Sequence, residues 1–183
     1  MNYWFTSDYH LGHWNICRYV GRPFKSLEEM NSTIIYNHNQ RVKPDDTVFM
    51  IGDFCFRNSL GGKKGEGDII RAIDYEKQLN GKLIFIQGNH DKNNSCKTNI
   101  HNIVIYFGSK WINLVHNPTH ASVNYEINLT GHVHNRWQCK RIKKGFGFTD
   151  CINVGVDVFG FKPISWQDIM KRYHQWKKEN NYV

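Results

Sequence analysis

The segment Lys82–Asp91, KLIFIQGNHD, places an amide, an imidazole and a carboxylate directly after an apolar run. Burying such polar groups costs free energy unless they find partners. One local explanation is a tight turn, because Gly, Asn and Asp favour turns. The other explanation is a catalytic site whose remaining members lie elsewhere in the chain. The other apolar runs of the sequence decide between the two.

Short apolar runs recur along the chain, and each ends in a cluster of Gly, Asp, Asn or His. Their β-branched and aromatic content predicts strands. We expect these strands at Tyr3–Thr6 and Thr47–Ile51, and within 82–87, 110–115, 125–130 and 151–158. Helical periodicity predicts helices over 26–41, 67–79 and 165–180, the first and last capped by Ser26 and Ser165. The early half alternates strand and helix, and the later half is rich in strands.

This pattern predicts an α/β fold in which two sheets are flanked by helices. At 183 residues the chain is expected to form a single domain over 1–183. Its hydrophobic content of 40% fits a globular protein. No apolar run is long enough to cross a bilayer, so we expect no membrane partner.

The charge and the cysteines narrow the function classes. A formal net charge of +8 fits either a solvated basic surface or attraction to phosphates and nucleic acids. The densest basic run is KRIKK at 140–144, which alone does not establish nucleic-acid binding. Five cysteines without CxxC spacing favour reduced thiols. With no apolar signal core near Met1, we expect a cytoplasmic protein.

Seven potential metal ligands follow the predicted strands, at positions that one rim of an α/β sheet would gather together. They are Asp8, His10, Asp53, Asn89, His116, His132 and His134. Each alone is more often a cap or a satisfied polar residue. Together, three carboxylate or amide oxygens and four imidazoles suit two divalent transition ions. Alternation along an extended segment lets Asp8 and His10 point to the same side, as it does for His132 and His134.

The ordered motifs SDYH, GDF, GNHD, VHNP and GHVH, between Ser7 and His134, resemble those of the calcineurin-like metallophosphoesterase superfamily. The segments DYHLGHWNI and INVGVDVFGFKPIS further resemble a small bacterial and phage-type branch of it. The resemblance implies a four-layer α/β/β/α sandwich of two mixed sheets. It also implies a centre of two divalent ions, with manganese expected first and Fe, Zn, Ni or Co as alternatives.

The resemblance also assigns roles to the site residues. Asp8, His10, Asp53 and His134 would hold one ion, and Asp53 would bridge to a second ion held by Asn89, His116 and His132. His90 would be the catalytic acid or the phosphate-contacting imidazole, with Asp91 orienting it. A hydroxide shared by two metal ions would then attack the phosphate ester directly, without a phospho-enzyme. On this basis the GNHD cluster is partnered by metal and substrate.

The substrate class stays open at this point. The basic charge favours a phosphodiesterase acting on a nucleotide or a nucleic-acid-like substrate. The alternatives are a phosphomonoesterase, a binding scaffold that has lost catalysis, and a nucleic-acid-binding module. The oligomeric state cannot be inferred from the sequence.

Three further residues are candidates for substrate contacts. His13 and Asn15 lie shortly after Asp8, where a loop hydrogen bond or a helix cap is the competing explanation. Arg57 follows Asp53 and is expected to pair with a phosphate oxygen. The segment Gly61–Gly67, GGKKGEG, lacks the Gly-Lys-Ser/Thr ending of a nucleotide-binding P-loop, so we expect a basic surface or rim loop instead.

Overall fold

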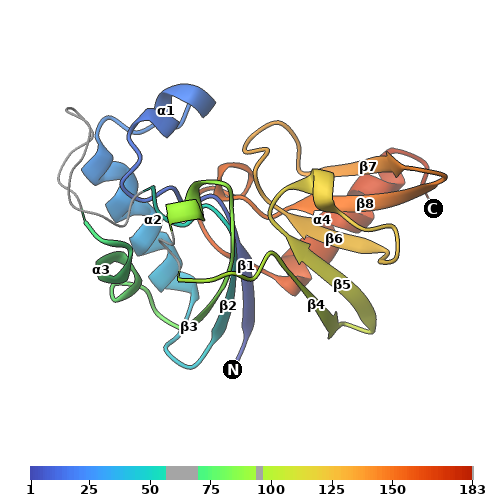
Figure 1. Cartoon of the computed structure of the whole chain (residues 1–183), viewed down its shortest axis with the longest axis horizontal. Coiled ribbons are helices and arrows are strands. Elements are labelled where there is room, and N and C mark those ends of the chain that lie inside the picture. Colours follow the sequence, from blue (N-terminus) through green and yellow to red (C-terminus); the bar gives the residue numbers. More distant parts are fainter. Residues whose placement is uncertain (57–69, 94–96, 183) are drawn as a thin grey trace.

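The computed structural model describes residues 1–56, 70–93 and 97–182, and within them two mixed β-sheets face each other (Figure 1). The first sheet has the strand order β3-β2-β1-β9. Its strands are β1 (Tyr3–Thr6), β2 (Thr47–Ile51), β3 (Lys82–Ile86) and β9 (Ile164–Ser165). Because β1, β2 and β3 run parallel, their carboxyl ends meet at one rim.

The second sheet has the order β4-β5-β6-β8-β7. Its strands are β4 (Asn102–Phe107), β5 (Lys110–Val115), β6 (Ile127–Thr130), β7 (Cys139–Lys144) and β8 (Gly147–Asn153). The three central strands, β5, β6 and β8, are parallel. A bridge between Ser7 and Gly155 joins the carboxyl ends of β1 and β8. The rims of both sheets therefore meet.

The crossovers between the parallel strands β1, β2 and β3 contain helices, and one more helix follows β9. They are α1 (Asn15–Val20), α2 (Leu27–Arg41), α3 (Ala72–Glu76) and α4 (Trp166–Glu179), with 3₁₀ turns η1 (His90–Asn93), η2 (Pro118–His120) and η3 (Val156–Val158). The expected caps are present: Ser26 accepts from the backbone of Glu29, and Ser165 forms a reciprocal capping box with Asp168.

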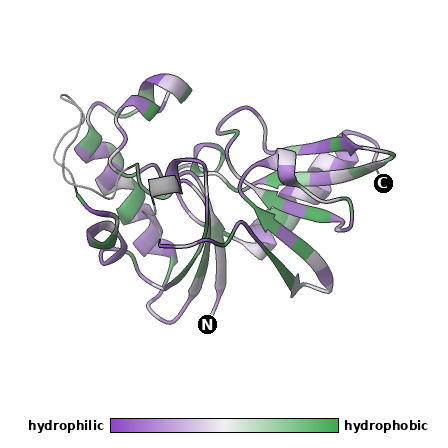
Figure 2. Ribbon diagram, in the orientation of Figure 1, coloured by the Kyte–Doolittle hydropathy of each residue, from purple (hydrophilic) through white to green (hydrophobic). Residues whose placement is uncertain are grey.

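The core follows from the alternation of side chains along the strands. On β2, Phe49 and Ile51 point into a cluster shared with the second sheet and with Ile169 and Tyr173 of α4. Met50 points to the opposite face, which α1, α2 and α3 cover. Figure 2 shows hydrophobic residues along the strands of both sheets.

The predicted α/β class, with two mixed sheets and helices packed against them, is confirmed. Helix α4 packs on the face of the second sheet that meets the first sheet, where Tyr173 Oη donates 2.7 Å to Asp150. The opposite face carries a polar row in which Asn128 bonds Asn113 and Thr149. In the described part of the chain no disulfide forms, and no helix combines the length and apolarity needed to span a membrane.

Candidate metal centre

The loops that follow five strands meet at the common rim. Asp8 follows β1, Asp53 follows β2, and Asn89 follows β3. His116 comes directly after β5, and the loop after β6 carries His132 and His134. The backbone N–H of His132 donates to both carboxylate oxygens of Asp8, at 3.1 and 3.0 Å. This contact, across 124 residues of sequence, closes the ring of loops.

The first group of converging donors consists of Asp8, His10 and His134, whose ligand atoms lie within 4.8 Å of one another. Asp8 and His10 are fully buried. Nε2 of His10 has no hydrogen-bond partner among the described residues. A buried nitrogen left in this state is costly in an apolar setting, and a metal ion at this position would satisfy it.

The second group consists of Asp53, His116 and His132, again with ligand atoms within 4.8 Å. Oδ1 of Asn89 joins this group. It lies 3.1 Å from Nε2 of His116 and 2.8 Å from Nδ1 of His132. The amide oxygen thus lies between two imidazoles, close enough for all three side chains to bind one ion.

Asp53 lies between the two groups. Its Oδ2 is 3.4 Å from Nε2 of His10 and 3.3 Å from Nε2 of His116. Its Oδ1 accepts a 2.9 Å hydrogen bond from the backbone N–H of His90. One carboxylate oxygen therefore faces a histidine from each group.

Hydrogen bonds at Nδ1 of two histidines make Nε2 the ring nitrogen that could bind a cation. Nδ1 of His116 lies 2.8 Å from the carbonyl oxygen of Ile51, so Nδ1 carries the proton. Nδ1 of His134 lies 2.8 Å from Oδ2 of Asp157, with the same consequence. Outer partners of this kind fix the tautomer and orientation of metal-binding histidines.

The buried carboxylates and imidazoles of the centre have shifted pKa values. Burial raises the pKa of Asp8, and it lowers the pKa of His10 to about 3. Burial also opposes a charge on His116, but the hydrogen bond to Asp53 and the charge of Asp8 outweigh it and raise the pKa of His116 to about 9. Burial opposes a charge on Asp53, but the nearby rings of His10 and His116 outweigh it and hold the pKa of this carboxyl below its usual range. A bound cation would replace the proton that His116 otherwise retains.

The backbone is strained at five of the seven residues. Asp8, His10, Asp53, His132 and His134 all have φ between 50° and 69°. Residues other than glycine rarely adopt this left-handed region, and each instance costs free energy. The surrounding structure therefore holds these side chains in conformations that local preference would not select.

Two glycines make room for the carboxylates. A Cβ atom on Gly131 would come within 2.4 Å of Asp8 Oδ2 and 1.9 Å of Ser7 Oγ. A Cβ atom on Gly88 would come within 2.2 Å of Asp53 Oδ1. The Gly of the GNHD and GHVH motifs is therefore required by close approach of the backbone to Asp53 and Asp8.

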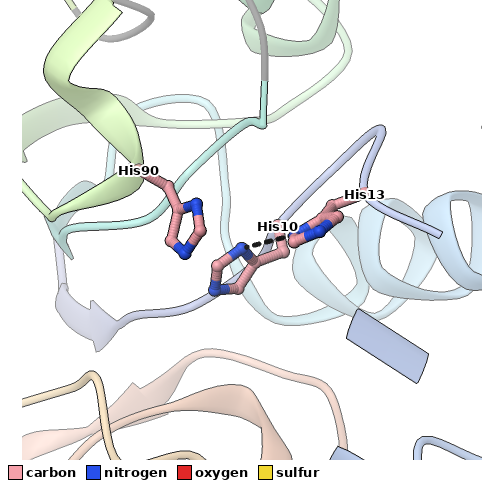
Figure 3. Close-up of side chains that lie close together, drawn as sticks. All are labelled: His10, His13 and His90. Carbon is pink, nitrogen blue, oxygen red and sulfur yellow. Dashed lines mark hydrogen bonds between the residues drawn. The ribbon is translucent and has the colours of Figure 1, made fainter. Parts of the chain in front are cut away.

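The rings of His90 and His13 lie beside the ring of His10, which Figure 3 draws between them. The ring centroids of His10 and His90 are 5.0 Å apart, and Nδ1 of His13 is 3.4 Å from Nδ1 of His10. His13 stacks on Phe56 with a centroid distance of 3.9 Å. Burial lowers the pKa of His13 to about 4, which keeps the ring neutral. Both sequence-predicted imidazoles are thus brought to the centre.

Asp91 supports the turn that carries Asp53. Its Oδ2 accepts hydrogen bonds from the backbone N–H groups of Asp53 and Gly88, at 2.7 and 2.8 Å. Its Oδ1 accepts from the N–H of Phe54 at 3.2 Å. The carboxylate of Asp91 therefore holds the backbone on either side of the Asp53 turn. That Asp91 also orients His90 stays a prediction.

The sequence reasoning missed three buried residues behind the centre. Arg22 donates to Asp157 at 2.7 and 3.0 Å and to the carbonyl oxygen of Asp8 at 2.6 Å. Asn153 donates to the carbonyl oxygen of His134 at 2.7 Å. One signal was present: Asp157 is the only charged residue in the apolar run 151–160. A lone carboxylate in such a run indicates a buried, paired group.

The structure describes one of the two remaining candidates for substrate contacts, Asn15, but not the other, Arg57. Asn15 is the half-buried first residue of α1, two residues beyond His13. Arg57 and the loop Gly61–Gly67 lie outside the described residues.

Comparison with known proteins places this chain in a family. No family model matches the chain. Uncharacterized protein MJ1445 of Methanocaldococcus jannaschii is 33% identical over 176 residues, which cover 93% of this chain and 90% of that protein. The chain belongs to the MJ1445 family. Gene 66 protein of Mycobacterium phage L5 is 31% identical over 126 residues, covering 69% of this chain and 56% of the phage protein.

The fold of this chain also occurs in a solved structure. The protein of unknown function AQ665 from Aquifex aeolicus is 26% identical, with a TM-score of 0.66. The match covers 93% of this chain and 98% of the Aquifex chain. These relatives identify a family and a fold but no activity. The chemistry of the site has to be argued from the residues themselves.

Proposed function

We propose that the protein is a metal-dependent phosphoesterase with a centre for two divalent ions. Asp8, His10, Asp53 and His134 would hold one ion, and Asp53, Asn89, His116 and His132 would hold the other. The observation that carries this proposal is the position of Asp53 Oδ2, at 3.4 and 3.3 Å from a histidine nitrogen of each group. The orphaned Nε2 of His10 and the five strained ligand positions support it.

The donor set fits such ions. Oxygens from Asp8, Asp53 and Asn89 combine with four imidazoles, a mixture that suits divalent first-row metals. Manganese is the first ion to test, because three of the seven donors are oxygens. When bound, two such ions would activate a water as nucleophile and offset negative charge on the phosphoryl oxygens.

The remaining chemistry falls to the chain's own side chains. His90 lies beside His10 at the outer side of the centre, where it can donate a proton to the departing alkoxide. His13 lies beside His10, and its Nδ1 can accept a hydrogen bond from the Nδ1–H of His10 when Nε2 of His10 binds a cation. Arg22 and Asp157 hold the Asp8 backbone and the His134 ring in place.

We favour a phosphodiester over a phosphomonoester as the substrate. The net charge of +8 attracts polyanions, and nucleotides and nucleic acids are the common biological phosphodiesters. A phosphomonoester would bind the same two ions, so the preference has to be tested directly.

The test compares hydrolysis of bis-p-nitrophenyl phosphate and p-nitrophenyl phosphate across Mn, Fe, Zn, Ni and Co. Asp53→Asn serves as the inactive control, because it removes the shared anionic oxygen. Metal-dependent hydrolysis of the diester that vanishes in Asp53→Asn is the expected result. Activity on the monoester alone would indicate a phosphatase. No activity with any ion, in protein shown to be folded and metal-loaded, would contradict the proposed function.

A further inference from the structure

A basic groove of about 620 Å³ lies between η2, the loop after β6, and strand β7. Figure 1 shows η2 close to the β7–β8 hairpin. Nζ of Lys144 donates to the carbonyl oxygen of Thr119, which fixes η2 to the hairpin. The KRIKK run of the sequence is strand β7, so the densest basic stretch of the chain forms one wall.

The groove is lined in part by residues of two loops that carry proposed metal ligands. Val133, which lines it, stands between His132 and His134 in the sequence. Pro118, on the opposite side, lies two residues beyond His116. The groove and the proposed metal centre therefore share these two loops.

The cations in the groove are available for a ligand. Arg136, Lys140 and Lys143 line it and are exposed. Within the described part of the chain, none of the three pairs with a carboxylate, and no acidic residue lines the groove. The neighbouring Arg141 differs, because its guanidinium is bound to Asp150 at 2.7 and 2.9 Å.

Trp137 adds an aromatic surface among these cations. Its side chain is half-buried, and its ring stacks on no other ring in the described residues. Asn153 Nδ2 donates to the carbonyl oxygens of both Trp137 and His134, at 2.9 and 2.7 Å. The tryptophan is therefore held in fixed relation to a proposed metal ligand.

We infer that this groove binds a single-stranded nucleic acid whose backbone runs toward the metal centre. Arg136, Lys140 and Lys143 would contact successive phosphates, and Trp137 would stack on an unpaired base. A base inside a duplex is already stacked on its neighbours, so the tryptophan favours a single strand. An acidic peptide would match the charges but would offer no base to the ring. The inference rests on the proposed function, because it names the substrate class of that centre.

The test measures binding and hydrolysis separately. Binding of a fluorescein-labelled ten-nucleotide oligo-dT is followed by anisotropy with the full chain in EDTA, where cleavage does not interfere. The variants are Trp137→Ala and the double variant Lys140→Ala/Lys143→Ala. Matched controls are Trp111→Ala, on an exposed ring of β5, and Lys43→Ala/Lys82→Ala, at the opposite ends of the strands. Hydrolysis of bis-p-nitrophenyl phosphate with added metal is the second readout.

We expect Trp137→Ala to weaken oligo-dT binding by about tenfold or more. The double lysine variant should also make binding less dependent on salt, reducing the magnitude of the negative slope of log K against log salt by about 1.4. Controls should bind as wild type does, and Trp137→Ala should hydrolyse bis-p-nitrophenyl phosphate normally. Polyglutamate of equal charge should not displace the oligonucleotide.

Unchanged binding by Trp137→Ala, or displacement by polyglutamate, would overturn the inference in favour of a general anion surface. Absence of bis-p-nitrophenyl phosphate hydrolysis in wild type, with Trp137-dependent binding intact, would instead remove the proposed activity and leave the strand-binding groove standing.

Discussion

Nδ1 of His134 donates a 2.8 Å hydrogen bond to Oδ2 of Asp157, whose side chain is only 3% exposed. Asp157 is in turn bound by the buried guanidinium of Arg22, which also holds the backbone of Asp8. Two of the four proposed ligands of one metal ion, His134 and Asp8, thus share a support formed by the Arg22–Asp157 pair.

Replacing Asp157 by Asn should weaken metal binding more than it changes the chemistry. The amide keeps the shape of the side chain but removes the charge that orients His134. We expect the metal Kd to rise by about 10- to 100-fold, with activity partly restored at high metal concentration. Isothermal titration with Mn²⁺ measures the Kd, and Asp45→Asn, an exposed aspartate, is the control. An unchanged Kd would show that Asp157 only stabilises the fold.

Gly131→Ala should displace Asp8. The added Cβ would lie within 2.4 Å of the Asp8 carboxylate, so either the loop after β6 or the carboxylate has to move. We expect loss of metal binding and of activity. Gly147→Ala, where the nearest atom is 3.5 Å away, should leave both unchanged. Metal content by mass spectrometry is the readout, and a fully loaded Gly131→Ala protein would contradict the assignment of Asp8 as a ligand.

His90→Ala should slow turnover by about 10²- to 10⁴-fold on diesters with poor leaving groups, because such groups need a proton as they depart. On bis-p-nitrophenyl phosphate, whose leaving group needs little assistance, the loss should be smaller. Metal content should stay normal. His174→Ala, an exposed histidine on α4, is the matched control. An equal loss on both substrates would argue against a role as general acid.

His38 should make stability depend on pH. Nδ1 of His38 accepts from Tyr9 Oη at 2.8 Å, and its Nε2 donates to the carbonyl of Asn80. Burial lowers the pKa of His38 from 6.5 to about 4. The unfolded chain therefore takes up a proton that the folded chain does not, and stability is lost as pH falls through this window.

The loss attributable to His38 should be about 2 kcal/mol between pH 7 and pH 5. Urea unfolding of wild type and His38→Gln at both pH values isolates this contribution from the other buried histidines. The stability advantage of wild type at pH 7 should shrink or reverse at pH 5. A difference that is independent of pH would show that the folded-state pKa of His38 is not depressed.

Much of the fold could be predicted because local signals agree with it. The bounds of β1 and β2 match the predicted ones, and the caps Ser26 and Ser165 begin α2 and α4 as expected. Strand β7 was not predicted, because four of its six residues are charged and it lies at the edge of its sheet. Edge strands commonly carry charges, which obscure the alternation that identifies a strand.

The candidate site could be collected from the sequence because its members follow successive strands. What the sequence could not supply is the set of contacts between distant segments. Arg22 and Asp157 are separated by 135 residues, and no local sequence pattern predicts that they pair. The left-handed backbone at His10 and Asp53 is likewise imposed by tertiary contacts rather than by residue preference.

The number of Mn²⁺ ions bound per chain tests most directly whether Asp53 is shared by two metal ions. Equilibrium dialysis against Mn²⁺, followed by mass spectrometry of metal and protein, gives the ions bound per chain. We predict two ions for wild type and at most one for Asp53→Asn, because Asp53 Oδ2 faces a histidine of each group. A wild-type protein that binds fewer than two ions, or an Asp53→Asn variant that keeps both, would contradict the shared centre.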